Sequence, residues 1–159
     1  ILRGLVGSEM CIRDRPSTIT RLQNMGTPDY LISAATQMVL AQRLARRNCK
    51  ECRVPDEDVT PKVLTDLGFS PEQASRTKAI KGKGCAKCKD SGYKGRQGIY
   101  EILVVSKPIK EAILRQATTP ELREIAIKEG FQTMQDMGRR MIANGELSFR
   151  EYERVLSAS

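Results

Sequence analysis

The sequence predicts an α/β fold that carries an inserted four-cysteine metal-binding element and ends in a helical C-terminal part. Three observations lead to this prediction. Two C-x-x-C pairs stand well apart in the chain, the apolar run QGIYEILVV is typical of a buried strand, and short helical patterns fill the sequence after Ser106. The 159 residues suffice for one ordinary domain or two small ones.

The opening residues, ILRGLVGSEMCIRDR, show no clear periodicity, cap or turn signal. The part LVGSEMCIRDR resembles the conceptual translation of a sequencing-library adapter, a known contaminant of assembled reads. We therefore expect residues 1–15 to be non-native and native sequence to start near Pro16. An ordinary N-terminal tail is the alternative. In either case Cys11 is not expected to bind a metal.

Two short helices are expected before the first cysteine pair. Ser17 can cap a helix through TITRLQNM that ends at Gly26, and Pro28 opens a second helix through PDYLISAATQ. The following segment, MVLAQRLARR, is ambiguous. Its apolar residues fit both an alternating strand and a helical continuation, so periodicity leaves both open.

The four paired cysteines indicate a structural metal site. They are Cys49 and Cys52 in RRNCKECRVP, and Cys85 and Cys88 in GKGCAKCKDSG. Two C-x-x-C turns can converge on one ion and complete a tetrahedral four-sulfur site of the structural zinc type. The pairs are separated by residues 53–84, a longer span than the usual ~15–20 residues. Since the chain has no histidine, mixed cysteine–histidine sites are excluded.

Three other uses of these cysteines compete with zinc. Two independent redox sites are disfavoured, because neither pair starts a helix after a buried strand. A disulfide framework suits a small secreted protein better than a lysine-rich chain without a convincing signal peptide. A rubredoxin-like iron site is the sharper rival, since it accepts long spacings. Such a site relies on surrounding aromatic residues, and these make up only 4% of this chain.

The span between the pairs is expected to form a small helical insert. Thr60 precedes a proline and starts a helix that Gly68 ends. Ser70, with Gln73 three residues later, has the spacing of a capping box and starts another.

Beyond the second pair, Gly92, Gly95 and Gly98 indicate a tight, hairpin-like approach to the buried strand QGIYEILVV. Four short helices are then expected, in KPIKEAILRQA, PELREIAIKE, MQDMGRRMIAN and FREYERVLS. The residues expected to cap or close the last three are Thr119, Gly130, Gly145 and Ser148, with Glu151 in capping-box register to Ser148. This third of the chain contains no catalytic constellation.

The formal charge of +8, from 27 basic and 19 acidic residues, invites a nucleic-acid-binding interpretation. The segment Arg76–Arg96 holds eight basic residues and one acidic residue, Asp90. Tyr93 is its only aromatic residue, so stacking partners for bases are almost absent. We favour a solvated metal loop, and a free-standing zinc-ribbon nucleic-acid-binding module is the alternative function.

Several functional classes have no support in the sequence. Neither GKGCAKCK nor GYKGRQG has the G-x-x-x-x-G-K-[ST] spacing of a phosphate-binding loop. Catalytic sets that need histidine are impossible in a chain without it. No apolar run approaches the ~20 residues of a membrane-spanning helix.

Four stretches of the chain resemble the C-terminal part of the hexameric secretion ATPases, the motors of type IV pilus assembly and type II secretion. They are PSTITRLQNMG, ISAATQMVLAQRLARRNCKEC, GCAKCKDSGYKGRQGIYEIL and EGFQTMQDMGRRMIANGELSFREYERVL. The resemblance covers residues 16–159 and includes both cysteine pairs. NGELSFREYERV is closer to pilus-assembly motors than to their retraction counterparts, which lack the cysteine pairs.

The resemblance implies the C-terminal end of a RecA-like ATPase core, and it resolves MVLAQRLARR as a strand. It also implies a division of the chain into four native segments. These are the end of the RecA-like core (16–48), the tetracysteine zinc insert (49–95), a core strand (96–105) and a C-terminal helical subdomain (106–159).

The resemblance further implies that the parent protein is a homo-hexameric ATPase that uses ATP and Mg²⁺. It would lie in the cytoplasm, peripherally associated with the inner membrane, and contact an inner-membrane platform protein. The phosphate loop, acidic boxes and histidine box of the family precede this segment, so the fragment is expected to be inactive alone, without catalytic or nucleotide-binding residues. Gln42, Arg43 and Arg96 match polar family positions, and we assign them no chemical role.

Overall fold

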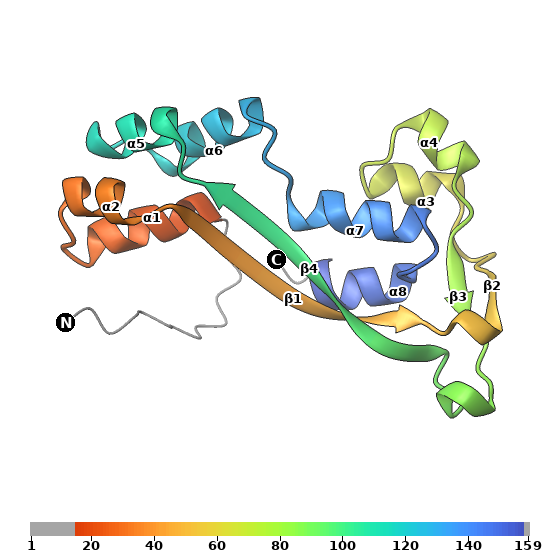
Figure 1. Cartoon of the computed structure of the whole chain (residues 1–159). Helices are drawn as coiled ribbons and strands as arrows, with labels where there is room; N and C mark the ends of the chain where they lie inside the picture. The colour runs from red at the N-terminus through yellow and green to blue at the C-terminus, as the bar shows by residue number, and fades with distance from the viewer. Residues whose placement is uncertain (1–14, 158–159) are drawn as a thin grey trace.

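The computed structural model describes residues 15–157, which form a long two-stranded ribbon with helices at both ends (Figure 1). The ribbon pairs β1 (Met38–Asn48) with β4 (Tyr93–Val104) in antiparallel orientation. The predicted α/β class is therefore confirmed. Residues 1–14 of the predicted non-native head lie outside the described residues.

Both strands of the ribbon were expected from the sequence or from the family resemblance. β1, which periodicity left open, is a strand along its whole length. Its pairing with β4 is regular up to Arg46 opposite Arg96 and then shifts at a bulge. β4 starts at Tyr93, earlier than the predicted strand QGIYEILVV, so Gly95 lies inside the strand and not in a separate approach to it.

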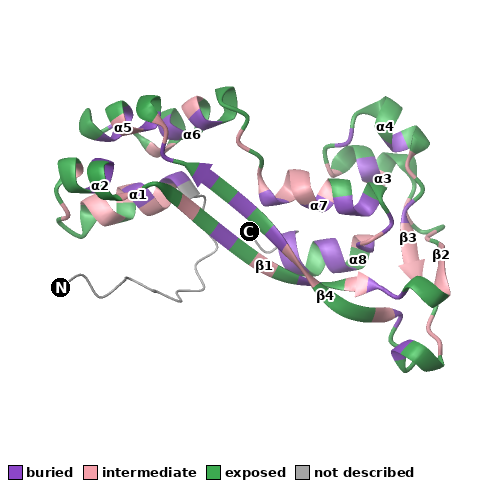
Figure 2. Ribbon diagram, in the orientation of Figure 1, coloured by how far each residue is buried: buried purple, intermediate pink, exposed green. Residues whose placement is uncertain are grey.

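The expectation of a buried strand holds for one face of β4 only. Ile99 and Leu103 are fully buried, whereas Tyr100, Ile102 and Val104 are 40–59% exposed. Exposed and buried residues alternate along this part of β4, as the ribbon colours in Figure 2 show. The reason is that helices cover one face of this two-stranded sheet, and no second layer among residues 15–157 covers the other.

One helical cluster surrounds the end of the ribbon where β4 finishes (Figure 1). Its helices are α1 (Arg15–Asn24), α2 (Asp29–Ala35), α5 (Lys107–Leu114) and α6 (Thr119–Lys128). The fully buried side chains of its core include Ile19, Ile32, Leu103, Ile109 and Leu122. Apolar burial of this kind is the main force that holds helices on a sheet.

A second helical cluster packs further along the ribbon, towards the cysteine pairs. Its helices are α3 (Pro61–Asp66), α4 (Pro71–Arg76), α7 (Met134–Ala143) and α8 (Phe149–Tyr152), which continues as a π-helical turn, Glu153–Ser157. Thus the helices after Ser106 do not share one core, because α5 and α6 join the first cluster and α7 and α8 the second. None of the helices within residues 15–157 is long and apolar enough to cross a bilayer.

Most helix starts agree with the local sequence signals, but Ser17, the expected cap of the first helix, lies inside α1. Thr60 caps α3, and Ser70 with Gln73 forms the predicted capping box at α4. At α6 the predicted cap is wrong by one residue. The N–H of Thr118, not that of Thr119, binds the Glu121 carboxylate at 2.7 Å.

Candidate metal centre

Each cysteine pair lies in a tight 3₁₀ turn next to a strand of a second, smaller sheet. β2 (Arg53–Pro55) follows the first pair, and β3 (Ile80–Gly82) precedes the second. The two strands are antiparallel, with Arg53 opposite Gly82. This pairing brings the two ends of the insert together. The sheet was not indicated by the sequence, which predicted only helices in the insert.

The sulfur atoms of the four predicted ligands form a single cluster, and all lie within 4.8 Å of one another. The Sγ–Sγ distances are 3.9 Å for Cys49–Cys85, 3.9 Å for Cys52–Cys88 and 3.6 Å for Cys85–Cys88. Four sulfur atoms that bind one tetrahedral ion at ~2.3 Å would lie about 3.8 Å apart. The donor set therefore fits a tetrahedral thiolate site.

The same distances argue against two of the other uses of these cysteines, a disulfide framework and two independent redox sites. All four are free, and their separations are far above the ~2.05 Å of a disulfide bond. Sulfur atoms from opposite pairs lie nearly as close together as those within the Cys85–Cys88 pair. The pairs therefore belong to one centre and not to two independent redox sites.

The local backbone and burial set different ionisation tendencies within the cluster. The N–H of Gly84 points at the Cys52 sulfur (3.3 Å), and that of Cys85 at the Cys88 sulfur (3.2 Å). Burial and the neighbouring thiols raise the pKa of Cys52 to about 12. Burial also opposes ionisation of Cys88, but the N–H groups of Cys85 and Gly92 lower its pKa to about 6. Cys52 would need a nearby cation to ionise at neutral pH.

A close approach of two glycines fixes the path of the chain beside the cluster. A Cβ atom added at Gly82 would lie 1.9 Å from the carbonyl oxygen of Gly92. That carbonyl accepts the N–H of Cys49 at 2.9 Å. Only glycine at position 82 lets the two segments come this close. Sequence reasoning treated Gly92 as a turn signal and missed its contact with Gly82.

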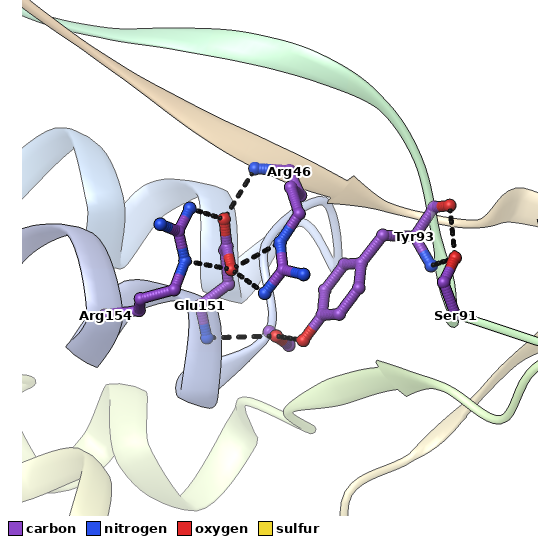
Figure 3. Close-up of polar contacts among 6 residues, drawn as sticks. Arg46, Ser91, Tyr93, Glu151 and Arg154 are labelled. Carbon is purple, nitrogen blue, oxygen red and sulfur yellow. Dashed lines mark hydrogen bonds and ion pairs between the residues drawn. The ribbon is translucent and has the colours of Figure 1, made fainter.

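A second polar constellation, also missed by sequence reasoning, joins the ribbon to α8 (Figure 3). Glu151 is fully buried, and its carboxylate accepts hydrogen bonds from the Arg46 backbone N–H (2.8 Å) and guanidinium (2.7 and 2.9 Å) and from the Arg154 guanidinium. The predicted capping box at Ser148 is therefore only half right. Ser148 does accept the Glu151 N–H, but the carboxylate binds the two arginines instead of reaching back to Ser148.

Tyr93 connects this constellation to the metal centre. Its ring lies under the Arg46 guanidinium, 4.2 Å from Cζ to the ring centroid, and its hydroxyl is 3.0 Å from the Ser148 hydroxyl. On the other side, the Ser91 hydroxyl donates to the Cys88 carbonyl (2.6 Å), and its oxygen also lies 3.0 Å from the Tyr93 carbonyl oxygen. The second cysteine turn is thus joined to α8 through a continuous set of polar contacts.

The three polar residues that match family positions occupy different places. Gln42 donates to the hydroxyl of Tyr100 at 3.4 Å on the exposed face of the ribbon. Arg43 donates to the carbonyl of Val155 in the C-terminal turn. Arg96 is exposed, opposite Arg46. None of the three contacts the cysteine cluster within the described chain.

Comparison with known proteins gives consistent matches. A family model described as "Type II/IV secretion system protein" matches residues 6–154. The type IV pilus assembly ATPase PilB of Myxococcus xanthus is 36% identical over 147 residues, which cover 92% of this chain and 26% of the relative. PilB of Thermus thermophilus is 40% identical over 137 residues, 84% of this chain and 15% of the relative.

Type II secretion system protein E of Aeromonas hydrophila is 32% identical over 152 residues, 95% of this chain and 29% of the relative. The chain therefore spans less than a third of the length of these relatives. The family match includes the four clustered cysteines and almost all of the described residues. This chain belongs to the type II/IV secretion system protein family.

Proposed function

We propose that this chain is the C-terminal part of a motor ATPase that powers type IV pilus assembly or type II protein secretion. The observation that carries the proposal is the family membership. Relatives named as pilus assembly ATPases and as a type II secretion protein each match 84% or more of this chain, and each is several times longer. This membership favours the motor over a free-standing nucleic-acid module.

Within such a motor, we propose a structural zinc ion held by Cys49, Cys52, Cys85 and Cys88. Four thiolates in tetrahedral arrangement are a donor set that zinc prefers, and with four protein ligands no position stays open for catalysis. When bound, the ion would cross-link the two ends of the insert. Because the two ligand-bearing turns are more than 30 residues apart in the sequence, metal-binding energy would contribute to folding.

ATP hydrolysis is assigned to the part of the parent protein that precedes this segment in the family. The sequence contains neither the G-x-x-x-x-G-K-[ST] phosphate loop nor the histidine that the resemblance places in the catalytic boxes of the parent. The parent would be a homo-hexamer with a RecA-like core. This segment would supply contacts to neighbouring subunits and to a platform protein at the cytoplasmic face of the inner membrane.

A segment exchange tests the proposed function. Residues 16–159 would replace the matching segment in PilB of Myxococcus xanthus and, separately, in type II secretion protein E of Aeromonas hydrophila. We expect one chimera to restore pilus assembly or secretion in a strain that lacks its own protein. The same chimera with Cys49→Ser and Cys85→Ser should fail. If both cysteine-intact chimeras are soluble and hydrolyse ATP but neither restores its process, the proposal is wrong.

Elemental analysis of the purified chain tests the metal separately. We expect about one zinc ion per chain. Iron, with the red colour of a four-sulfur iron site, would replace the zinc assignment without affecting the family membership.

A further inference from the structure

Two arginines face each other across the ribbon near its bulge. Arg46 on β1 is directly opposite Arg96 on β4. Like charges in directly opposite positions of an antiparallel pair repel each other, so this pair lowers stability unless an anion lies nearby. Arg46 has a counter-charge in Glu151, but no ion pair or hydrogen bond of the Arg96 side chain exists within residues 15–157.

A third arginine completes the group. Arg154 follows α8, and its guanidinium binds Glu151 from the side opposite Arg46 (Figure 3). Arg46, Arg96 and Arg154, together with Leu44, line a cavity of about 440 Å³. Three of the residues that line the cavity are therefore cationic and one is apolar. None of the four cysteines lines it.

Glu151 does not occupy all the N–H donors of these arginines. A guanidinium has five N–H donors. Arg46 and Arg154 each use Nε and Nη2 for the carboxylate, which leaves Nη1 of both without a partner in the described part of the chain. Arg96 uses none. Three positive charges and one negative charge leave an excess of two positive charges at the cavity.

Two of the three arginines are also held in place before any ligand binds. Glu151 is 0% exposed and fixes Arg46 and Arg154, while the Tyr93 ring supports Arg46 from below. Ordered donors lose little conformational entropy on binding, which favours affinity. The exposed Arg96 can adjust to the ligand.

We propose that Arg46, Arg96 and Arg154 form a binding site for a phosphate group. A phosphate dianion matches the excess of two positive charges, and its oxygens accept the paired N–H donors of guanidinium groups. Leu44 provides an apolar wall against which the non-phosphate part of the ligand can lie. The phosphate could belong to a free ion or to a lipid headgroup, and the experiment separates these sources.

Arg96→Gln is the central variant, because Arg96 has no structural partner among the described residues. Lys94→Gln is the matched control. It removes the same charge from an exposed position of the same strand, and Lys94 does not line the cavity. Binding of inorganic diphosphate to the full chain would be measured by calorimetry at constant ionic strength, with chloride as the control anion.

We expect saturable binding to the wild-type chain, a loss of about tenfold or more in affinity for Arg96→Gln, and a change of less than about twofold for Lys94→Gln. The affinity of Arg96→Lys should be intermediate, since lysine keeps the positive charge but lacks the paired N–H donors of the guanidinium. Without diphosphate, Arg96→Gln should melt no lower than wild type, because a repulsion is removed. Equal losses for Arg96→Gln and Lys94→Gln, or no saturable binding to wild type, would overturn the proposal.

Sedimentation with vesicles identifies the source of the phosphate. Vesicles of phosphatidylcholine with phosphatidic acid should bring down wild type but not Arg96→Gln if the ligand is a lipid headgroup. Binding of diphosphate without such co-sedimentation assigns the site to a free phosphate compound. Equal sedimentation of wild type and Arg96→Gln would exclude a lipid role for the cavity.

Discussion

Glu151 is a single buried carboxylate that joins residues 105 positions apart in the chain. Burial alone would raise its pKa. The guanidinium groups of Arg154 and Arg46, with the Arg46 backbone N–H, outweigh burial and lower the pKa to about 2 from an ordinary 4.5. The spacing from Ser148 to Glu151 predicted a local capping role. The actual partner, Arg46, could not be predicted, because nothing in the sequence near either residue indicates the other.

The depressed pKa of Glu151 has a direct consequence for stability. A carboxyl with a lower pKa in the folded state contributes stability that is fully present above about pH 4.5 and is lost as the pH falls towards 2. The contribution at neutral pH is on the order of 3 kcal/mol. We therefore expect Glu151→Gln to unfold at lower urea concentration at pH 7, and to lose less stability than wild type between pH 4.5 and 3.

Glu153→Gln provides the control for this prediction, because Glu153 is an exposed carboxylate two residues away. Its stability curve should follow that of wild type. The assigned role of Glu151 is wrong if Glu151→Gln and wild type show parallel pH dependence in urea unfolding.

At the scale of elements, features set by residues close in sequence were mostly predicted correctly, whereas features that depend on tertiary packing were not. Thr60 and Ser70, each directly before a proline, marked the starts of α3 and α4, and Gln73 completed the signal at α4. Such signals are reliable because a cap is made by residues close in sequence. The cysteine spacing likewise predicted which four side chains meet. The β2–β3 sheet and the half-exposed face of β4 depend on which segments pack together, and short-range periodicity does not contain that information.

The contact between β3 and the segment after the second cysteine pair gives a sharp prediction. Gly82→Ala would place a Cβ atom 1.9 Å from the Gly92 carbonyl oxygen, so the two backbones must separate. Overpacking of this kind costs about 1–3 kcal/mol. Because the Gly92 carbonyl also binds the N–H of Cys49, we expect weaker metal binding in competition with a chromophoric chelator.

Gly95→Ala separates this steric effect from backbone strain. Gly95 has φ of +81°, but no atom lies within 4 Å of the place that an alanine Cβ would take, so the substitution should cost about 1 kcal/mol of stability and leave metal affinity unchanged. If Gly82→Ala binds the metal as tightly as Gly95→Ala does, the close approach does not support the centre.

At the scale of the whole molecule, the ribbon connects two separate cores. The first surrounds the end of β4 and contains α1, α2, α5 and α6. The second contains α7 and α8 together with α3 and α4, the two helices of the cysteine insert (Figure 1). Leu64 and Phe69 of the insert are buried in the second core only. A disturbance at the cysteines should therefore reach the second core before the first, because local stability follows local contacts.

Removal of the metal from the intact chain tests this separation. With the cross-link gone, the insert loses the constraint that joins its two ends, and amide hydrogen exchange should accelerate by about tenfold or more in residues 49–98. The packing of α7 and α8 should loosen next, because these helices contact the insert and the second cysteine turn through Tyr93 and Ser148. Residues 107–128 should stay protected, since α5 and α6 pack in the other core. Re-addition of zinc should restore the original pattern. Uniform loss of protection along residues 15–157 would show instead that the ribbon makes both cores one cooperative unit, with the metal holding the whole fold.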